Sequence, residues 1–233
     1  MADIALVTGA GSGLGAVIAE HLAAEGFTVA VNTRARAKEA DAVVAAIQAV
    51  NGRAFAVTAD VTDPSAVQRM FETVAGHGTL RVLVNNASIR PRQPVHEITE
   101  DDWRRVHAVT LDGAFRCIRY ALAALRPGGR IVNILGRNAL DGDPEKVHVS
   151  AAKHGLLGLT LALAAALRED RVAVNAVSPG IDADVSHGPE LDQCRAEIAA
   201  QVARFALAQG EPTGTVVRVD CHGSVVSAAP QAW

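Results

Sequence analysis

The stretch DIALVTGAGSGLG, residues 3–15, decides the fold of this 233-residue chain. Residues 3–7 form a short apolar run that is typical of a buried strand, and residues 8–15 place a glycine-rich loop directly after it. Glycine lets the backbone turn tightly and approach a phosphate, while the free N–H groups and the dipole of the helix that starts here attract negative charge. A glycine-rich loop between a first strand and a first helix therefore predicts a dinucleotide-binding site.

Apolar, β-branched runs alternate with longer segments of helical period along the whole chain. This alternation is typical of right-handed βαβ units and of a parallel sheet with helices on both faces. We expect strands near 3–7, 27–32, 53–58, 81–84, 129–134, 171–177 and 215–219. We expect helices near 13–25, 36–50, 64–76, 101–126, 147–169 and 191–209. The predicted fold is therefore α/β, a three-layer Rossmann fold with a doubly wound, seven-stranded parallel sheet, in one domain over residues 1–233.

The bulk composition excludes several classes of protein. The formal charge is −3, aromatic residues make up 3%, and no basic stripe is present, which argues against a nucleic-acid partner. The three cysteines, Cys117, Cys194 and Cys221, lack metal-ligand spacing and predict free thiols and no metal site. The chain starts without a basic leader, and its longest apolar run, about 155–167, is too short to span a bilayer. We therefore expect a cytoplasmic protein without a membrane partner.

The segment 147–169 predicts an interface between subunits. It is apolar nearly all round, which is typical of a helix that is buried on more than one side. One side meets the sheet in a doubly wound fold, so we expect a homodimer or homotetramer through the helices 101–126 and 147–169. The alternative is a core helix in a monomer.

The glycine loop and several later motifs resemble those of the short-chain dehydrogenase/reductase family, in particular its FabG-like branch. The loop at 8–15 matches the family pattern T-G-x-x-x-G-x-G. Further matches follow the later strands in order, at Asp60-Val61, Asn85-Asn86-Ala87-Ser88, Asp102-Trp103, Gly129 to Asn133, Ser178-Pro179-Gly180 and Gly214 to Asp220. The resemblance covers nearly the whole chain and implies a nicotinamide cofactor and a small-molecule substrate.

The same resemblance implies which residues bind the cofactor. They are Gly9, Ser12, Gly13, Leu14, Gly15, Thr33, Arg34, Asp60, Val61, Asn86, Ala87, Lys153, Pro179, Gly180 and Ile181. NAD-binding folds of this type usually end the second strand with an acidic residue, but Thr33 and Arg34 stand there, with Arg36 nearby. A hydroxyl and a guanidinium accept a 2′-phosphate, so NADP(H) is favoured over NAD(H). The alternative is that both arginines are merely solvated.

The family's mechanism implies a tyrosine, a lysine, a serine and an asparagine, and this chain keeps one of them. Lys153 matches the lysine and also serves as a cofactor ligand. Val149 stands at the tyrosine position, Gly136 at the serine position and Thr110 at the asparagine position. Valine and glycine side chains offer no proton, and general acid catalysis contributes about 10²–10⁴-fold. We therefore expect ordinary ketone reduction to be slow or absent.

The first interpretation is an oxidoreductase of atypical mechanism. His148, His154 and Arg137 adjoin the vacated positions and are candidates for a substitute donor. Alternatively, an imine, an iminium or another activated substrate needs no strong acid, and nearby carboxylates stabilise a cation. The candidate carboxylates are Asp141, Asp143, Asp182 and Asp184, two of them in a short substrate loop at about 181–192.

Two other interpretations stay open. The chain can be a catalytically silent relative that binds NADP(H) as a sensor or as an assembly partner. It can also be a non-redox lyase or cyclase on the same scaffold, because fold does not fix function. The preserved nucleotide loop speaks against this third interpretation.

Overall fold

The computed structural model describes residues 2–35, 37–125, 127–180, 188–208, 213–220 and 225–228. Its strands form one sheet in the order β3-β2-β1-β4-β5-β6-β7-β8. The strands are β1 (Asp3–Val7), β2 (Thr28–Thr33), β3 (Arg53–Thr58), β4 (Thr79–Asn85), β5 (Arg130–Ile134), β6 (Ala173–Pro179), β7 (Val216–Val219) and β8 (Val225–Ala228). The pairings among β1 to β7 are all parallel, as predicted, and β8 adds an antiparallel edge that the sequence pattern did not predict.

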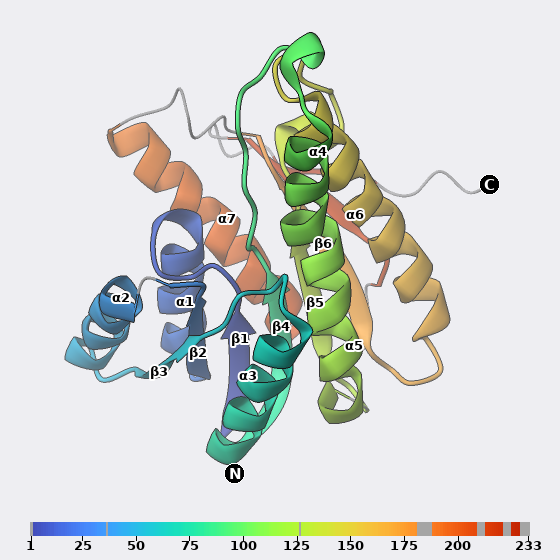
Figure 1. Ribbon diagram of the computed structural model, residues 1–233. Coiled ribbons are helices and arrows are strands. Elements are labelled where there is room, and N and C mark those ends of the chain that lie inside the picture. Colours follow the sequence, from blue (N-terminus) through green and yellow to red (C-terminus); the bar gives the residue numbers. More distant parts are fainter. Residues whose placement is uncertain are drawn as a thin grey trace.

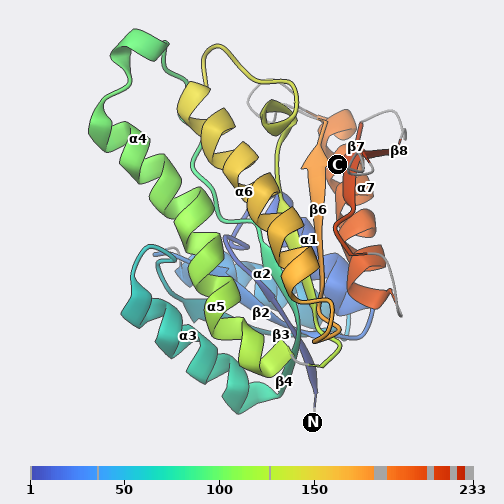
Figure 2. The same ribbon diagram turned by 90° about the vertical axis from the view of Figure 1, so that its right-hand side faces the viewer.

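Helices cover both faces of this sheet, so the predicted three-layer fold is confirmed (Figures 1 and 2). The helices are α1 (Gly13–Ala24), α2 (Ala37–Ala49), α3 (Pro64–His77), α4 (Glu100–His107), α5 (Gly113–Leu125), α6 (Val147–Ala166) and α7 (Pro189–Leu207). Buried residues of α1, α2 and α7 pack on one face, and those of α3 and α5 pack on the other face with the C-terminal end of α6.

The strands are apolar along their length because both faces of the sheet are covered. On β1, Ile4 and Leu6 point into one core cluster, while Ala5 and Val7 point into the other, and all four are fully buried. Such a strand reads as a continuous hydrophobic run rather than an alternating one. The hydrophobic effect on both faces therefore fixes the middle of the sheet.

The sheet reverses its strand order between β1 and β4. β1 pairs with β2 on one side and with β4 on the other. Loops that leave β1 and β4 go to opposite faces, which opens a crevice at the carboxyl ends of these strands. The glycine-rich loop lies at this crevice.

The predicted helix 101–126 is divided. α4 begins at a capping box in which Thr99 and Asp102 exchange hydrogen bonds, and a π-helical turn over Ala108–Asp112 separates α4 from α5. A Cβ atom at Gly113 would lie 2.7 Å from Cγ2 of Val61, so α5 packs closely on the segment after β3. The turn sets Thr110 inside the protein at the junction of the two helices.

Helix α6 is long and apolar enough to pass a length-and-composition test for a membrane span. In this fold it is a covering helix. Val149, Ala152, Leu156 and Ala164 on it are buried against the neighbouring elements. Packing within the chain thus accounts for one side of α6, and other apolar residues on it, such as Val147, stay exposed.

Candidate active site

The ends of β1 and β4 are tied together by reciprocal hydrogen bonds. The Thr8 hydroxyl accepts from the backbone N–H groups of Asn86 (3.0 Å) and Ala87 (3.1 Å). The Asn86 side chain in turn donates to the backbone oxygens of Thr8 and Gly9, each at 3.0 Å. These bonds hold the start of the glycine-rich loop against the residues that follow β4, on the other side of the crevice.

The glycines of the loop are required by its geometry. Gly9 and Gly13 have φ values of +63° and +58°, which residues with a Cβ atom rarely adopt. A Cβ atom at Gly15 would lie 2.5 Å from the Gly9 oxygen and 2.6 Å from Nδ2 of Asn86, so the first turn of α1 sits directly on the loop. No atom lies within 4 Å of a Cβ position at Gly13, which leaves this side open for a bound group. The cradle fits a pyrophosphate at the start of a helix.

A buried asparagine that the sequence analysis did not single out supports the same loop. Asn32, on β2, accepts a hydrogen bond from the Gly9 N–H at 3.3 Å. Its amide donates to the backbone oxygens of Val57 in β3 (3.3 Å) and of Ala59 just after β3 (3.1 Å). One side chain therefore connects the loop to two strand ends. Its position near the end of β2 was the only signal in the sequence.

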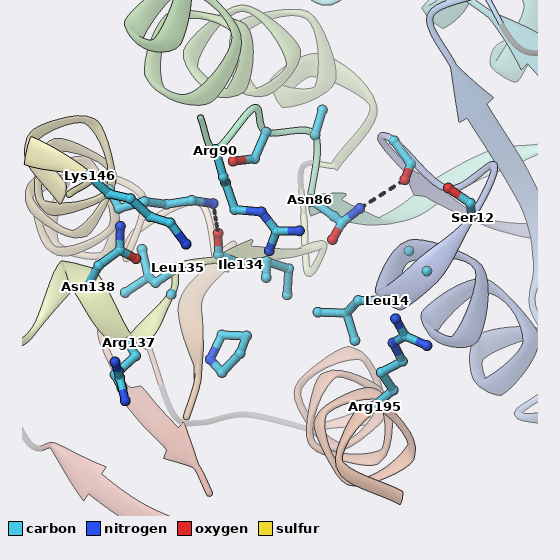
Figure 3. A pocket seen from close by; sticks show the side chains of 18 of the residues that line it. Ser12, Leu14, Asn86, Arg90, Ile134, Leu135, Arg137, Asn138, Lys146 and Arg195 are labelled. Atoms are coloured by element: carbon cyan, nitrogen blue, oxygen red, sulfur yellow. Dashed lines mark hydrogen bonds between the residues drawn. The ribbon is translucent and has the colours of Figure 1, made fainter. Parts of the chain in front are cut away.

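A cavity of about 280 Å³ opens beside the loop, at the carboxyl ends of β1, β4, β5 and β6 (Figure 3). Nine predicted cofactor residues line it: Gly9, Ser12, Gly13, Leu14, Gly15, Asn86, Ala87, Lys153 and Pro179. The structure therefore brings together residues that are far apart in sequence, from the first strand to the sixth. Of the predicted catalytic residues, Lys153 and Arg137 lie on its wall.

Lys153 projects from α6 into this cavity. Its Nζ donates a hydrogen bond of 2.7 Å to the backbone oxygen of Ile134 at the end of β5, drawn in Figure 3. Only 3% of the residue is exposed. Burial, and to a lesser extent the positive charge of Arg90, lowers the pKa of Lys153 to about 7. This ammonium group is thus ready to exchange a proton near neutral pH.

The position one turn before Lys153 belongs to the core. Val149 is fully buried and packs with Val106, Ala152 and Ile89 between α4 and α6. It is not among the described residues that line the cavity.

His148 is likewise buried and is not among the described residues that line the cavity, so this packing does not support its role as proton donor, which stays a prediction. It is fully buried, and neither ring nitrogen has a hydrogen-bond partner among the described residues. Burial lowers the pKa of His148, and the charges that act on it, from Asp102, His107 and Arg105, lie on α4. Because one residue on a helix is a rotation of about 100°, adjacency to the vacated position did not place His148 in the site. The other histidine candidate, His154, follows Lys153 on α6. Its Nδ1 forms a hydrogen bond of 2.9 Å with the backbone oxygen of Ala139.

Two further catalytic candidates contribute little to the reacting end. Thr110 is buried in the π-helical turn, and its hydroxyl neither lines the cavity nor has a partner among the described residues. Arg137 lines the cavity, but its guanidinium is directed away from Ile134 (Figure 3). Gly136, at the vacated serine position, lines the cavity and offers no side chain.

The remaining cofactor candidates lie beyond the cavity. Thr33 ends β2 beside Gly11, where a Cβ atom would be 3.4 Å from the Thr33 hydroxyl oxygen. Arg34 is exposed next to it. Asp60 and Val61 follow β3, and an Asp60 oxygen accepts from the Thr62 N–H and hydroxyl at 2.8 and 2.7 Å. The roles of these residues toward the adenosine end stay predictions.

Gly180 pairs with β7 through a bond of 2.8 Å from its N–H to the Val219 oxygen. Ile181, Arg36, Asp182, Asp184 and Cys221 lie outside the described residues, as does most of the predicted substrate loop at 181–192. Cys117 and Cys194 are both buried, and they are thiols, as predicted.

Five cationic side chains dominate the described wall of the cavity. They are Arg90, Arg137, Lys146, Lys153 and Arg195, against the single carboxylate of Asp143. Arg195 lies with Leu14 on the glycine-loop side, whereas Lys146 lies on the opposite side with Asn138 (Figure 3). Sequence analysis missed Arg90, Asn138, Lys146 and Arg195. Their signal was weak, because only the fold shows that these segments meet at one edge of the sheet.

Ion pairs hold the loops around the cavity. Arg92 and Glu145 form a salt bridge of 2.5 Å, and the Gln93 N–H donates to the Glu145 oxygen at 2.7 Å. On the other side, Arg218 pairs with Asp141 at 2.9 Å and with Asp220 at 3.0 Å. Asp141 is therefore engaged with Arg218 and does not line the cavity, and of the carboxylates expected to stabilise a cation, Asp143 alone lies on the described wall.

The comparisons with known proteins agree with this geometry. Residues 3–190 match the short chain dehydrogenase family. The chain is 36% identical over 210 residues to the 3-oxoacyl-[acyl-carrier-protein] reductase FabG of Staphylococcus aureus, which covers 88% of this chain and 85% of that protein. It is 39% identical over 182 residues to the 3-oxoacyl-[acyl-carrier-protein] reductase of Synechocystis, covering 77% and 74%.

Solved structures show the same relationship. A dehydrogenase/reductase from Sinorhizobium meliloti superposes with a TM-score of 0.86 at 35% identity and covers 94% of each chain. A short chain dehydrogenase from Burkholderia cenocepacia, solved in complex with NADP, superposes with a TM-score of 0.85 at 34% identity, covering 93% of this chain and 96% of the other. The chain belongs to the short-chain dehydrogenase/reductase family, as its FabG-like motifs indicated. It therefore carries the scaffold of an oxidoreductase with a nicotinamide cofactor.

Proposed function

We propose that this protein is an NADP(H)-linked oxidoreductase whose reaction runs without the tyrosine and serine of its family. One observation carries the proposal: Lys153 reaches the cavity, while the positions one turn before it and at the end of β5 are a core valine and a glycine. The relatives of similar sequence are named as reductases, which supports the reaction class. The cofactor supplies or accepts a hydride.

NADP(H) is the form of cofactor that the residues favour. Thr33 and Arg34 offer a hydroxyl and an exposed guanidinium at the end of β2, where a carboxylate would repel a 2′-phosphate. The structural neighbour from Burkholderia cenocepacia holds NADP. Arg195, beside Leu14, adds positive charge on the side where the loop cradles a pyrophosphate.

Lys153 is the proton donor in this proposal. Its ammonium lines the cavity, and its lowered pKa of about 7 matches the requirement that an acid titrate near the working pH. The Ile134 oxygen fixes the position of Nζ, which leaves its other protons for the cofactor ribose and the substrate. We expect this ammonium group to protonate the substrate less effectively than a tyrosine hydroxyl at position 149 would. The favoured substrates are therefore activated ones.

The charge of the cavity narrows the substrate class. An iminium ion would meet five cationic side chains and one carboxylate, which raises its energy in a poorly solvated site. A neutral imine or an electron-poor carbonyl compound avoids this repulsion. We therefore propose a neutral or negatively charged substrate that reacts in the part of the cavity near Lys153, beside the bound cofactor.

A second candidate function is a silent NADP(H)-binding relative. The packing of Val149 with Val106 and Ala152 favours it, because the residue at the tyrosine position is part of the core and leaves no open space for a substitute proton donor there. Fluorescence titration with NADPH, followed by absorbance assays with ketones, activated alkenes and cyclic imines, separates the alternatives. Binding with turnover of an activated substrate supports the oxidoreductase. Binding without any turnover supports the silent relative, and no binding leaves a non-redox lyase or cyclase.

We also propose a homodimer or homotetramer, with α4, α5 and α6 at the interface, in the cytoplasm. Large apolar side chains on these helices are exposed, among them Trp103, Phe115 and Val147. Helix α4 packs on α6 and continues through the π-helical turn into α5, so these side chains stand on neighbouring helices, and monomeric proteins rarely expose large apolar patches. Light scattering of the purified protein tests this part of the proposal: a monomer at micromolar concentration contradicts it.

A further inference from the structure

Helix α7 brings an arginine to the glycine-rich loop. Arg195, in the second turn of α7, lines the cavity together with Gly13 and Gly15 of the loop. In Figure 3 its side chain leaves α7 and points toward the loop, where its guanidinium lies beside Leu14. Helix α7 packs against α1, and the side chain of Arg195 is only 26% exposed. A cationic group is thus held beside the place where the loop cradles a phosphate.

The first turn of α1 has no acidic residue and no side-chain cap. Ser12 is its N-cap residue, and the Ser12 side chain makes no capping hydrogen bond. The first N–H groups of a helix lack intrahelical partners and carry the positive end of the helix dipole. No atom lies within 4 Å of a Cβ position at Gly13, so a bound group has space there. An anion at this point meets the helix N–H groups and can also meet Arg195.

The described partner of Arg195 is Asp192, one turn earlier on the same helix. The guanidinium and the carboxylate are 3.3 Å apart, and the Asp192 side chain is 76% exposed. Asp192 is not among the described residues that line the cavity. An exposed pair of this kind contributes little, because water screens the two charges. A pyrophosphate held by the loop offers the guanidinium two negative charges and several acceptor oxygens, which makes it the stronger partner.

From these contacts we infer that Arg195 is a cofactor-binding residue, which exchanges its ion pair with Asp192 for one with the pyrophosphate of the cofactor. NADPH and NADH share the pyrophosphate, so Arg195 adds affinity for both and does not choose between them. Asp192 competes for the same guanidinium and therefore lowers the affinity. The inference rests on the proposed function only in that the chain binds a nicotinamide dinucleotide.

The test titrates four full-length proteins with NADPH and with NADH, followed by fluorescence: the wild type, Arg195→Ala, Asp192→Asn and Asp192→Asn/Arg195→Ala. Arg195→Ala should weaken the binding of both cofactors about tenfold, as for a charged hydrogen bond that solvent partly screens. Asp192→Asn should strengthen both about two- to threefold, because the guanidinium loses its competing partner. In the double variant this gain should vanish, since no guanidinium remains to be released. Arg204→Ala removes an exposed arginine on α7 away from the cavity, and as the control it should change neither affinity.

Two fragments of the cofactor locate the contact. ADP carries a pyrophosphate, whereas adenosine 2′-monophosphate has none, and calorimetry measures the binding of each. Arg195→Ala should weaken ADP binding about tenfold and leave the affinity for adenosine 2′-monophosphate within about twofold of the wild type.

Three results would each overturn the inference: equal NADPH affinity in the wild type and Arg195→Ala, a similar loss for adenosine 2′-monophosphate, or a gain from Asp192→Asn that persists without Arg195. If the wild type binds NADPH and the affinity series behaves as described, but no substrate is reduced, the proposed reaction fails while the assignment of Arg195 stands. Binding of neither NADPH nor ADP to the wild type would overturn the inference together with the cofactor assignment.

Discussion

Val149 and Lys153 stand one helical turn apart on α6, yet only Lys153 reaches the cavity at the carboxyl ends of the central strands. Side chains at i and i+4 share one face of a helix, so a long hydroxyl-bearing residue at 149 would point the same way as Lys153. Val149 is too short and packs with Val106 and Ala152 instead. In the function that we propose, the family's scaffold is kept at the cofactor end and differs where the proton is transferred.

The glycine-rich loop should not tolerate a side chain at Gly15, in the first turn of α1. Gly15→Ala places a methyl group 2.5 Å from the Gly9 oxygen and 2.6 Å from Nδ2 of Asn86, which forces the loop away from β4. We expect the affinity for NADPH, measured by fluorescence titration, to fall by at least about tenfold, equivalent to about 1.4 kcal/mol. Gly76→Ala on α3, where no atom lies within 4 Å of the new Cβ, is the control and should bind NADPH normally.

Arg34 should decide between the two forms of the cofactor. The exposed side chain of Arg34 follows Thr33 at the end of β2. We expect the 2′-phosphate of NADPH to bind here, whereas the 2′-hydroxyl of NADH carries no charge for the guanidinium to bind. Arg34→Ala should weaken NADPH binding about five- to tenfold, as for the loss of a charged hydrogen bond partly screened by solvent. Binding of NADH, measured in the same way, should stay within about twofold of the wild type. Equal loss for both cofactors would mean that Arg34 acts on the loop rather than on the phosphate.

The rate of reduction should depend on the protonation of Lys153. Burial and the charge of Arg90 lower the pKa of this ammonium to about 7. The donor is protonated below this pKa and loses its proton above it, so kcat for reduction should be level at acid pH and fall about tenfold per pH unit above about 7. The reverse reaction, which needs the free amine, should rise over the same range. A rate of reduction that is constant from pH 6 to pH 9 would remove Lys153 as the donor.

His148 should lower the free energy of unfolding and take no part in the site. Both of its ring nitrogens are buried without partners among the described residues, and an unpaired buried polar group costs about 1–3 kcal/mol. His148→Leu should therefore raise the free energy of unfolding by this order and leave NADPH binding unchanged. Because burial lowers the pKa of His148, the unfolded chain binds the proton more readily than the folded one. The advantage of the variant should thus grow as the pH falls below about 6.5, the ordinary pKa of histidine. Chemical denaturation at several pH values measures it.

Much of the fold was predictable from sequence because its signals are local. The glycine-rich loop, the apolar runs and the helix periods each arise from neighbouring residues, so the seven parallel strands and their covering helices were placed to within a few residues. The antiparallel β8 and the π-helical turn before Gly113 were missed. The first carries no distinct pattern of its own, and the second interrupts a segment whose helical period continues across it.

The site was predictable only where a motif fixes it. The residues that were found through the resemblance and line the cavity are Gly9, Ser12, Gly13, Leu14, Gly15, Asn86, Ala87, Lys153 and Pro179. Arg90, Asn138, Lys146 and Arg195 were not found, because their meeting depends on which strand ends lie side by side. His148 was singled out by its distance along the chain, which says little about the direction of a side chain on a helix.

The most direct test of the account compares the wild-type protein on two substrates whose reacting carbon lies in a six-membered ring, cyclohexanone and a cyclic N-aryl imine (a 2H-1,4-benzoxazine, which stays unprotonated near pH 7), each at saturating NADPH near pH 7. A site that has Lys153 as its acid, Val149 in the core and no hydroxyl at 136 should turn over the imine and reduce the plain ketone at least about 100-fold more slowly, the lower bound for the loss of an efficient general acid. Reduction of cyclohexanone as fast as that of the imine would show that another group protonates the oxygen, and would contradict the account.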